Sequence, residues 1–116
     1  MDGHDYLHET ASLIRRGWCA GADARDRHGT AVPASDPAAV AWSLTGALAH
    51  VCERNDASLS SLSDALWGIS GVIPDSSLGA WNDATGRTQA ATLHMLANAS
   101  TSLTRQPPTE TTAQQN

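Results

Sequence analysis

Apolar residues recur every three or four positions in four stretches of this sequence, and that spacing is typical of amphipathic helices. We expect helices over residues 4–16, 37–54, 59–69 and 89–103. The second has the clearest start signal, because Ser35 and Asp36 are capping residues and Pro37 suits a first helical turn. Its apolar residues form two stripes, which predicts a central helix, and Gly46 would let a neighbouring segment approach closely.

The segment between the first two helices, residues 18–33, lacks helical spacing. Arg27, His28 and Gly29 form a turn-like centre, in which Gly29 would adopt a positive φ. The flanks are rich in alanine rather than β-branched residues, so a short β-hairpin and an ordered loop are both open. We therefore predict a mainly α fold, a compact bundle of about four helices with a short loop or β-hairpin after the first helix.

Length and composition predict one domain. The chain has 116 residues, 41% of them hydrophobic, which is enough to bury a core without disulfides. We expect a single helical domain over residues 1–103 and a disordered tail over 104–116, since the tail has nothing to bury. No apolar run approaches the ~20 residues of a membrane span, and the N-terminus lacks the features of a signal peptide. These observations predict a cytoplasmic protein that makes no membrane contact.

Charge bears on the kind of partner. The formal net charge is −5, and the seven basic residues are arginines spread along the chain. A phosphate backbone rewards a concentrated basic face, so direct nucleic-acid binding is not expected. A mildly acidic surface suits a protein partner that is itself basic. A homodimer is a separate option that the sequence leaves open. Cys19 and Cys52 lie far apart in the sequence, and two free thiols are expected rather than a disulfide.

The segment Ala80–Gln89 brings an aromatic ring, an amide, a carboxylate and a guanidinium together just before the last expected helix. One interpretation is structural: Asn82 or Asp83 caps that helix, with Thr85 as another capping candidate, while Trp81 anchors the loop on the core. The other is functional: the Arg87 guanidinium and free backbone N–H groups cradle an anion such as phosphate. A lone Gly-Arg-Thr is a weak phosphate-binding signal, which favours the structural interpretation.

Opposite charges indicate a contact across the fold. Arg25 and Asp26 could pair with Asp83 and Arg87, which would join the central loop to the last helix. An exposed ion pair of this kind adds only ~0.2–1 kcal/mol, so a tight network would serve more than stability. The candidate residues for binding a ligand or partner are Arg25, Asp26, Trp81, Asn82, Asp83, Arg87 and Thr88.

Histidines and cysteines give weaker signals for metal binding or catalysis. His4 and His8 lie four positions apart and would share a helix face, but no third ligand accompanies them. A Cys19 nucleophile would need a histidine base, for which His28 and His50 are the candidates. We therefore name no catalytic residue, no metal site and no cofactor, and enzymatic activity is not the favoured interpretation.

Several motifs occur in a fixed order, at Gly17-Trp18, Gly21, Ala24-Arg25-Asp26, Gly29, Pro37, Ala41–Leu48, Ala80–Asp83 and Gly86–Thr88. In this order the chain resembles, over residues 7–99, a small bacterial and phage family catalogued only as a domain of unknown function. Trp-Asn-Asp followed by Gly-Arg-Thr is the most specific part. The chain departs from the family at Ser43, where cysteine is usual, and at Ala20, where a polar residue such as glutamine is common. Both departures argue against a catalytic cysteine in the second helix.

The sequence favours a small, non-enzymatic cytoplasmic protein that binds another protein or complex. A phage-encoded inhibitor of a host defence or regulatory complex is one concrete form. The alternative is a small anion- or nucleotide-binding protein, or an enzyme, that uses the loop from Trp81 to Thr88 together with Arg25. A deep pocket lined by Trp81, Arg25 and Arg87 would favour the alternative, whereas a flat exposed patch would favour protein binding.

Overall fold

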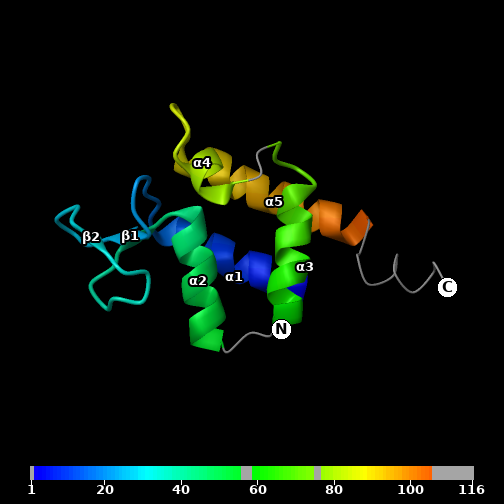
Figure 1. Ribbon diagram of the computed structural model, residues 1–116, viewed down its shortest axis with the longest axis horizontal. Coiled ribbons are helices and arrows are strands. Elements are labelled where there is room, and N and C mark those ends of the chain that lie inside the picture. The colour runs from blue at the N-terminus through cyan, green and yellow to red at the C-terminus, as the bar shows by residue number, and fades with distance from the viewer. Residues whose placement is uncertain (1, 56–58, 75–76, 106–116) are drawn as a thin grey trace.

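Helix α1 (Gly3–Arg16) opens the fold and has a defined start and end. The computed structural model describes residues 2–55, 59–74 and 77–105 (Figure 1). The Asp2 side chain accepts a hydrogen bond from Asp5 N at 2.8 Å, and the Asp5 carboxylate accepts one from Asp2 N at 3.1 Å. This capping box satisfies N–H groups that a helix start otherwise leaves without partners. The first expected helix is confirmed.

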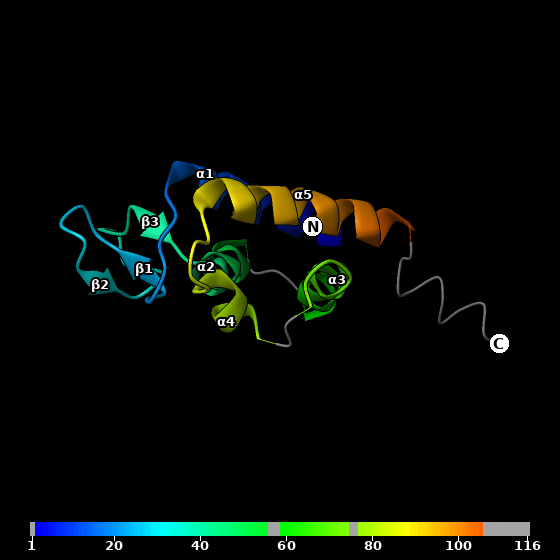
Figure 2. The ribbon, with the colours of Figure 1, turned by 90° about the horizontal axis from the view of Figure 1, so that it is seen from above.

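A three-stranded antiparallel sheet follows α1, with its strands in the order β2-β1-β3. The strands are β1 (Ala24–Arg25), β2 (Ala31–Val32) and β3 (Ala41–Trp42). β1 and β2 form a hairpin, one of the two structures expected here, and Gly29 has a φ of 80°. β3 pairs with the other edge of β1. The sheet lies at one end of the helices, beyond α2 (Figure 2).

The second helix is shorter than its sequence suggests. α2 spans Leu44–Asn55, so the expected start at Pro37 is wrong. Asp36 does act as a capping residue, but of a turn: its carboxylate accepts a hydrogen bond from Ala38 N at 2.8 Å. The Asp36 carbonyl accepts a second hydrogen bond, from Ala39 N at 3.0 Å. This three-residue spacing closes a single turn, and no α-helix continues from it.

Pairing with the sheet accounts for the late start of α2. Val40 N donates to Arg25 O at 2.8 Å, and Trp42 N donates to Gly17 O at 3.0 Å. A backbone N–H that already donates to the sheet or to the end of α1 cannot also serve a helix. Ser43 then caps α2, because its hydroxyl accepts a hydrogen bond at 3.1 Å from the third backbone N–H of the helix.

Three further helices complete the described chain: α3 (Leu59–Ser70), α4 (Leu78–Asn82) and α5 (Gln89–Arg105). α3 and α5 correspond to the third and fourth expected helices. α4 was not expected, because a helix of five residues is too short to show a periodic pattern. Ser77 caps it by accepting a hydrogen bond from Ala80 N at 3.2 Å.

The expected domain boundary can be compared only in part. α5 continues to Arg105, past the expected end of the domain at residue 103. The remainder of the expected tail, residues 106–116, lies outside the described residues, as do residues 56–58 before α3.

The helices form two layers (Figure 2). α1 and α5 lie side by side in one layer, and α2 and α3 cross them in the other. α1 contacts the three other long helices, α2, α3 and α5, whereas α4 packs against α2. Among the long helices, α1 rather than the expected α2 is therefore the central one. The mainly α fold with a hairpin after the first helix is confirmed, with five helices, four of them long, in the described ranges.

The core lies where these layers meet. Tyr6 is fully buried, and its hydroxyl donates to Leu48 O at 2.7 Å, which joins α1 to α2. A Cβ at Gly46 would collide with the Asp23 carbonyl oxygen, so the close approach expected at this glycine is confirmed. Within the described ranges, no helix has both the length and the apolar character needed to cross a membrane.

Candidate functional site

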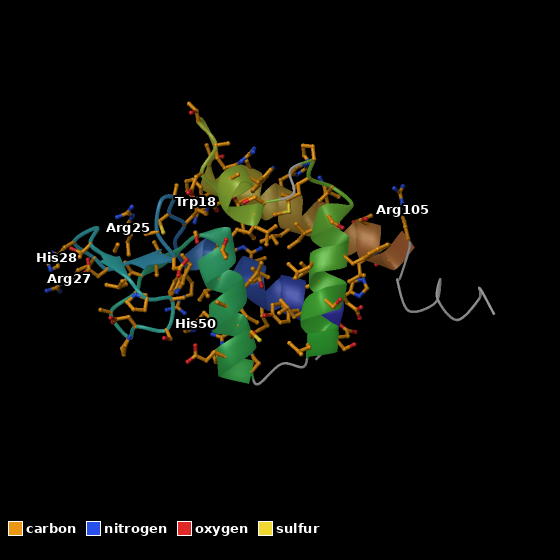
Figure 3. The ribbon with its side chains drawn as sticks, in the orientation of Figure 1. Trp18, Arg25, Arg27, His28, His50 and Arg105 are labelled. Atoms are coloured by element: carbon orange, nitrogen blue, oxygen red, sulfur yellow. The ribbon has the colours of Figure 1, made fainter. Side chains whose placement is uncertain are left out.

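The segment Ala80–Gln89 contains the end of α4, a turn, and the start of α5. Trp81 is 6% exposed and belongs to the hydrophobic core, so it anchors this segment as the structural interpretation expected. The turn brings the segment beside the loop that follows α1, where Figure 3 labels Trp18. Residues more than 60 positions apart in the sequence therefore form one site.

Asn82 is the centre of this site. Its side chain is 1% exposed and makes four hydrogen bonds, which is the full capacity of an amide of two donors and two acceptor positions. Oδ1 accepts from Trp18 Nε1 at 2.8 Å and from Leu44 N at 3.0 Å. Nδ2 donates to Cys19 O at 3.1 Å and to Asp83 Oδ1 at 3.0 Å. One amide thus joins α4, the loop after α1 and the start of α2.

Asp83 continues the same network. Its Oδ1 also accepts a hydrogen bond from Gly21 N at 2.9 Å. The hydrogen bond from Asn82, and then the one from Gly21, hold the pKa of this carboxyl below its ordinary value, because both favour the ionised form. Asp83 thereby ties the end of α4 to the loop after α1.

Thr88 caps α5, and the expected capping role of Asn82 or Asp83 is wrong. The Thr88 hydroxyl accepts a hydrogen bond from Ala91 N at 3.1 Å, and its carbonyl accepts one from Thr92 N at 3.1 Å. Both earlier side chains already have partners in the loop after α1. The capping residue of a helix is the one immediately before its first residue, because its side chain must reach the free N–H groups of the first turn. Thr88 holds that position, since α5 begins at Gln89.

Arg87 stacks on Trp81 instead of pairing with Asp83. Its guanidinium carbon lies 3.7 Å from the centroid of the Trp81 ring, and its Nε donates to Trp81 O at 2.8 Å. No ion pair between Arg87 and a carboxylate is formed among the described residues, and the guanidinium instead makes a cation–π contact with the indole. Among the residues that the structure describes, the ion pair found joins Arg54 to Glu9 at 2.8 Å.

Arg25 and Asp26 stabilise the hairpin and do not reach Arg87. Arg25 donates to Gly29 O at 2.9 Å and to Ala20 O at 3.0 Å. The Asp26 carboxylate accepts hydrogen bonds from two backbone N–H groups of the hairpin turn, at 2.9 and 3.0 Å. Figure 3 shows Arg25 beside the hairpin, so the expected pairing across the fold is absent from the described residues.

The hollow that Trp81 and Arg87 do line involves residues that sequence reasoning missed. It measures about 250 Å³ and lies between α5 and the segment after α3. Its floor contains the buried side chains of Ile73, Trp81 and Met95, and its rim contains Arg87, His94 and Asn98. We call this the α5 hollow. Arg25 is not among its lining residues, so the alternative site is only partly assembled.

Three other histidines and Cys19 have partners within the fold, and His28 Nε2 accepts a hydrogen bond from Arg27 Nε at 3.3 Å. His4 Nε2 lies 2.7 Å from Thr104 Oγ1, and His50 Nδ1 lies 3.0 Å from Ala34 O. Cys19 is a buried free thiol whose Sγ lies 3.7 Å from Ala22 O. No group of three metal-ligating side chains occurs within the described ranges.

The outward side of α3 exposes apolar side chains. Leu59 is 82% exposed, Leu66 36% and Trp67 48%. Helical spacing places them on one side of α3 with Ser63 and Ser70, and we call these five residues the α3 outer face. None of the five is charged. Sequence reasoning did not single out this face, because an apolar residue at helical spacing has the same signature whether it is buried or exposed.

These features define a small, mainly helical protein in which the buried amide of Asn82 joins the loop after α1 to the end of α4 and the start of α2. Residues 3–102 match a family of unknown function, DUF6197, and the chain belongs to that family. The family resemblance noted in the sequence over residues 7–99 is thereby confirmed. No curated protein and no solved structure matches the chain.

Proposed function

We propose that this protein is a non-enzymatic binding module that recognises another protein through the α3 outer face. The observation that carries this proposal is the exposure of Leu59, Leu66 and Trp67 on one side of a single helix. Apolar residues scattered singly over a surface are ordinary, whereas several gathered in one place mark interaction sites. An exposed tryptophan adds weight, since aromatic residues are enriched among those that dominate binding energy.

The partner surface that fits this face is apolar and uncharged. The α3 outer face has no carboxylate or cation with which a charged partner group could pair. Such a partner group would lose its hydration without compensation, which costs free energy. We therefore expect the partner to present an apolar helix or groove.

The environment of the candidate site supports a non-enzymatic role. Asn82, Asp83, Arg87 and Thr88 each hydrogen-bond within the fold. Cys19 and His50, which a nucleophilic mechanism would combine, contact separate backbone carbonyls. The most specific motif of the sequence thus has a structural explanation, and a binding surface elsewhere on the chain accounts better for function. A phage-encoded inhibitor of a host complex would be one form of such a protein.

Affinity capture with matched variants tests this proposal. The wild-type chain, a Leu59→Ser/Leu66→Ser variant and a Val40→Ser control are each used to capture proteins from a lysate of the source cells. Val40 is an apolar residue, 47% exposed, that lies outside α3. We expect a partner that the wild type and the control retain and that the double variant loses. The purified partner should then bind the double variant at least tenfold more weakly than the wild type, and the control within twofold.

Two results would overturn the proposal. One is a captured partner that binds the double variant as tightly as the wild type, since the contact would then lie elsewhere. The other is self-association of the wild type, measured by sedimentation, that the double variant abolishes with no other protein captured. In that case a second copy of the chain would occupy the α3 outer face. Circular dichroism on all variants checks that each is folded.

A further inference from the structure

The α5 hollow has the composition of a small binding site. Its floor of Ile73, Trp81 and Met95 is apolar, and each of these residues is less than a tenth exposed. Its rim is polar, with Arg87, His94 and the Asn98 amide. Ligand sites generally combine an apolar lining with a few convergent polar groups. The volume of about 250 Å³ suits a ligand smaller than most drugs.

The Arg87 side chain is already positioned in a way that suits anion binding. Stacking on Trp81 at 3.7 Å and the bond from Nε to Trp81 O at 2.8 Å fix the plane of the guanidinium. Its two terminal nitrogens, Nη1 and Nη2, make no hydrogen bond to any residue that the structure describes. Paired N–H groups in one plane match the oxygens of a carboxylate or phosphate. Because the side chain is already ordered, a ligand would lose little of its binding energy in ordering it.

The charge around the hollow is opposite to that of the whole chain. The formal net charge is −5, yet the described residues that line the hollow include an arginine and a histidine and no carboxylate. An anion would therefore meet no like charge within the described lining. Arg87 would supply the main attraction, and His94 and Asn98 would supply further hydrogen bonds.

We propose that the α5 hollow binds a small organic anion, a carboxylate or phosphate monoester joined to an apolar group. The anionic end would lie against Arg87, His94 and Asn98, and the apolar group against Ile73, Trp81 and Met95. This site differs from an anion cradle at the start of α5, where the Thr88 hydroxyl already accepts from Ala91 N. It shares no residue with the α3 outer face, so either proposal stands or falls without the other.

Titration calorimetry with three probes of similar shape tests the site. Phenyl phosphate and benzoate represent the two anion classes, and benzyl alcohol is the neutral control. We expect saturable 1:1 binding of at least one anion, at least tenfold tighter than benzyl alcohol and weakened by added salt. The anion that binds more tightly identifies the class. If neither anion binds at millimolar concentration, or if benzyl alcohol binds equally well, the proposal is wrong.

Substitutions of the rim residues test whether the anion binds in the α5 hollow. Arg87→Gln should weaken anion binding at least tenfold, whereas Arg27→Gln, which removes the same charge from the exposed hairpin turn, should change it less than twofold. Because Arg87 also stacks on Trp81, a His94→Gln/Asn98→Ala variant provides an independent test on exposed positions of α5. We expect it to stay folded and bind at least threefold more weakly. Unchanged binding in this variant and in folded Arg87→Gln would overturn the assignment.

Discussion

Asn82 Oδ1 accepts a hydrogen bond from Trp18 Nε1 at 2.8 Å, across 64 positions of sequence. The same oxygen accepts from Leu44 N at 3.0 Å, so one buried atom holds both the loop after α1 and the first turn of α2. The amide nitrogen completes the contact through Cys19 O. The most specific motif in the sequence is therefore explained by the way it joins distant parts of the chain.

Replacing Asn82 should destabilise the protein strongly. Asn82→Ala would leave Trp18 Nε1, Leu44 N and Cys19 O without their partner in a buried site. Each buried polar group left unsatisfied costs about 1–3 kcal/mol, so we expect a loss of at least ~3 kcal/mol in the free energy of unfolding. Asn98→Ala, at an exposed position of α5, should change it by less than ~0.5 kcal/mol. Urea denaturation measures both, and similar values for the two variants would contradict the role of Asn82.

Stability should fall in acid partly because of Asp83. The hydrogen bonds from Asn82 and Gly21 lower the folded pKa of this carboxyl below 3.8, its ordinary value. Its contribution is therefore fully present above that ordinary value and is lost as the pH falls through the folded pKa. We expect Asp83→Asn to show a shallower loss of stability than the wild type between about pH 5 and pH 2, a range that spans the ordinary pKa of a carboxyl group.

Asp2 provides the comparison for that measurement. Its pKa is also lowered, chiefly by the hydrogen bond from Asp5 N in the capping box of α1. Asp2→Asn should therefore also make the loss of stability in acid shallower, and the double variant should show a still shallower loss. Urea midpoints recorded against pH provide the data. If Asp83→Asn and the wild type give parallel curves, the hydrogen bonds of Asp83 do not act on the folded state.

Two glycines should respond in opposite ways to alanine. In Gly46→Ala the new Cβ would collide with the Asp23 carbonyl oxygen, so α2 and the loop before it must separate. We expect a loss of about 1–3 kcal/mol, as for other overpacked sites. In Gly79→Ala, within α4, the nearest group is Ser77 Oγ at 3.8 Å, an ordinary contact. Helix propensity should then raise stability by up to ~1 kcal/mol. Thermal and urea unfolding measure the stability of both variants. A change of the same sign in the two would contradict the prediction.

The thiol of Cys19 should react slowly in the folded protein. Burial raises its pKa; Arg25 opposes this, while Asp83 and Asp23 raise it further. Since the thiolate is the reactive form, both low access and a raised pKa reduce alkylation. In a Cys52→Ser background, iodoacetamide should modify Cys19 far more slowly in the folded chain than in urea. Equal rates in the two conditions would show that Cys19 is accessible.

Local signals in the sequence determined the helices that depend on local contacts. The spacing of apolar residues and the stops at Gly17 and Gly71 place α1 and α3 correctly, because a helix bonds within itself over four residues. The turn at Gly29 was predictable for the same reason, since a positive φ is a property of one residue. The apolar anchoring of Trp81 also followed from its residue type.

Tertiary structure alone decided where α2 begins and what the Trp81–Thr88 segment does. Ser35, Asp36 and Pro37 form a good helix start, yet the sheet takes the backbone groups that such a helix would need. The partners of Asn82 and Asp83 lie more than 60 positions earlier in the chain, and no spacing within the motif indicates them. Helix propensities contribute only a small free energy at each residue. A buried polar group, in contrast, needs a hydrogen-bond partner, which can lie anywhere in the sequence. The sequence by itself therefore determined the long helices α1, α3 and α5, whereas only the packed structure decided where α2 begins and which polar side chains meet.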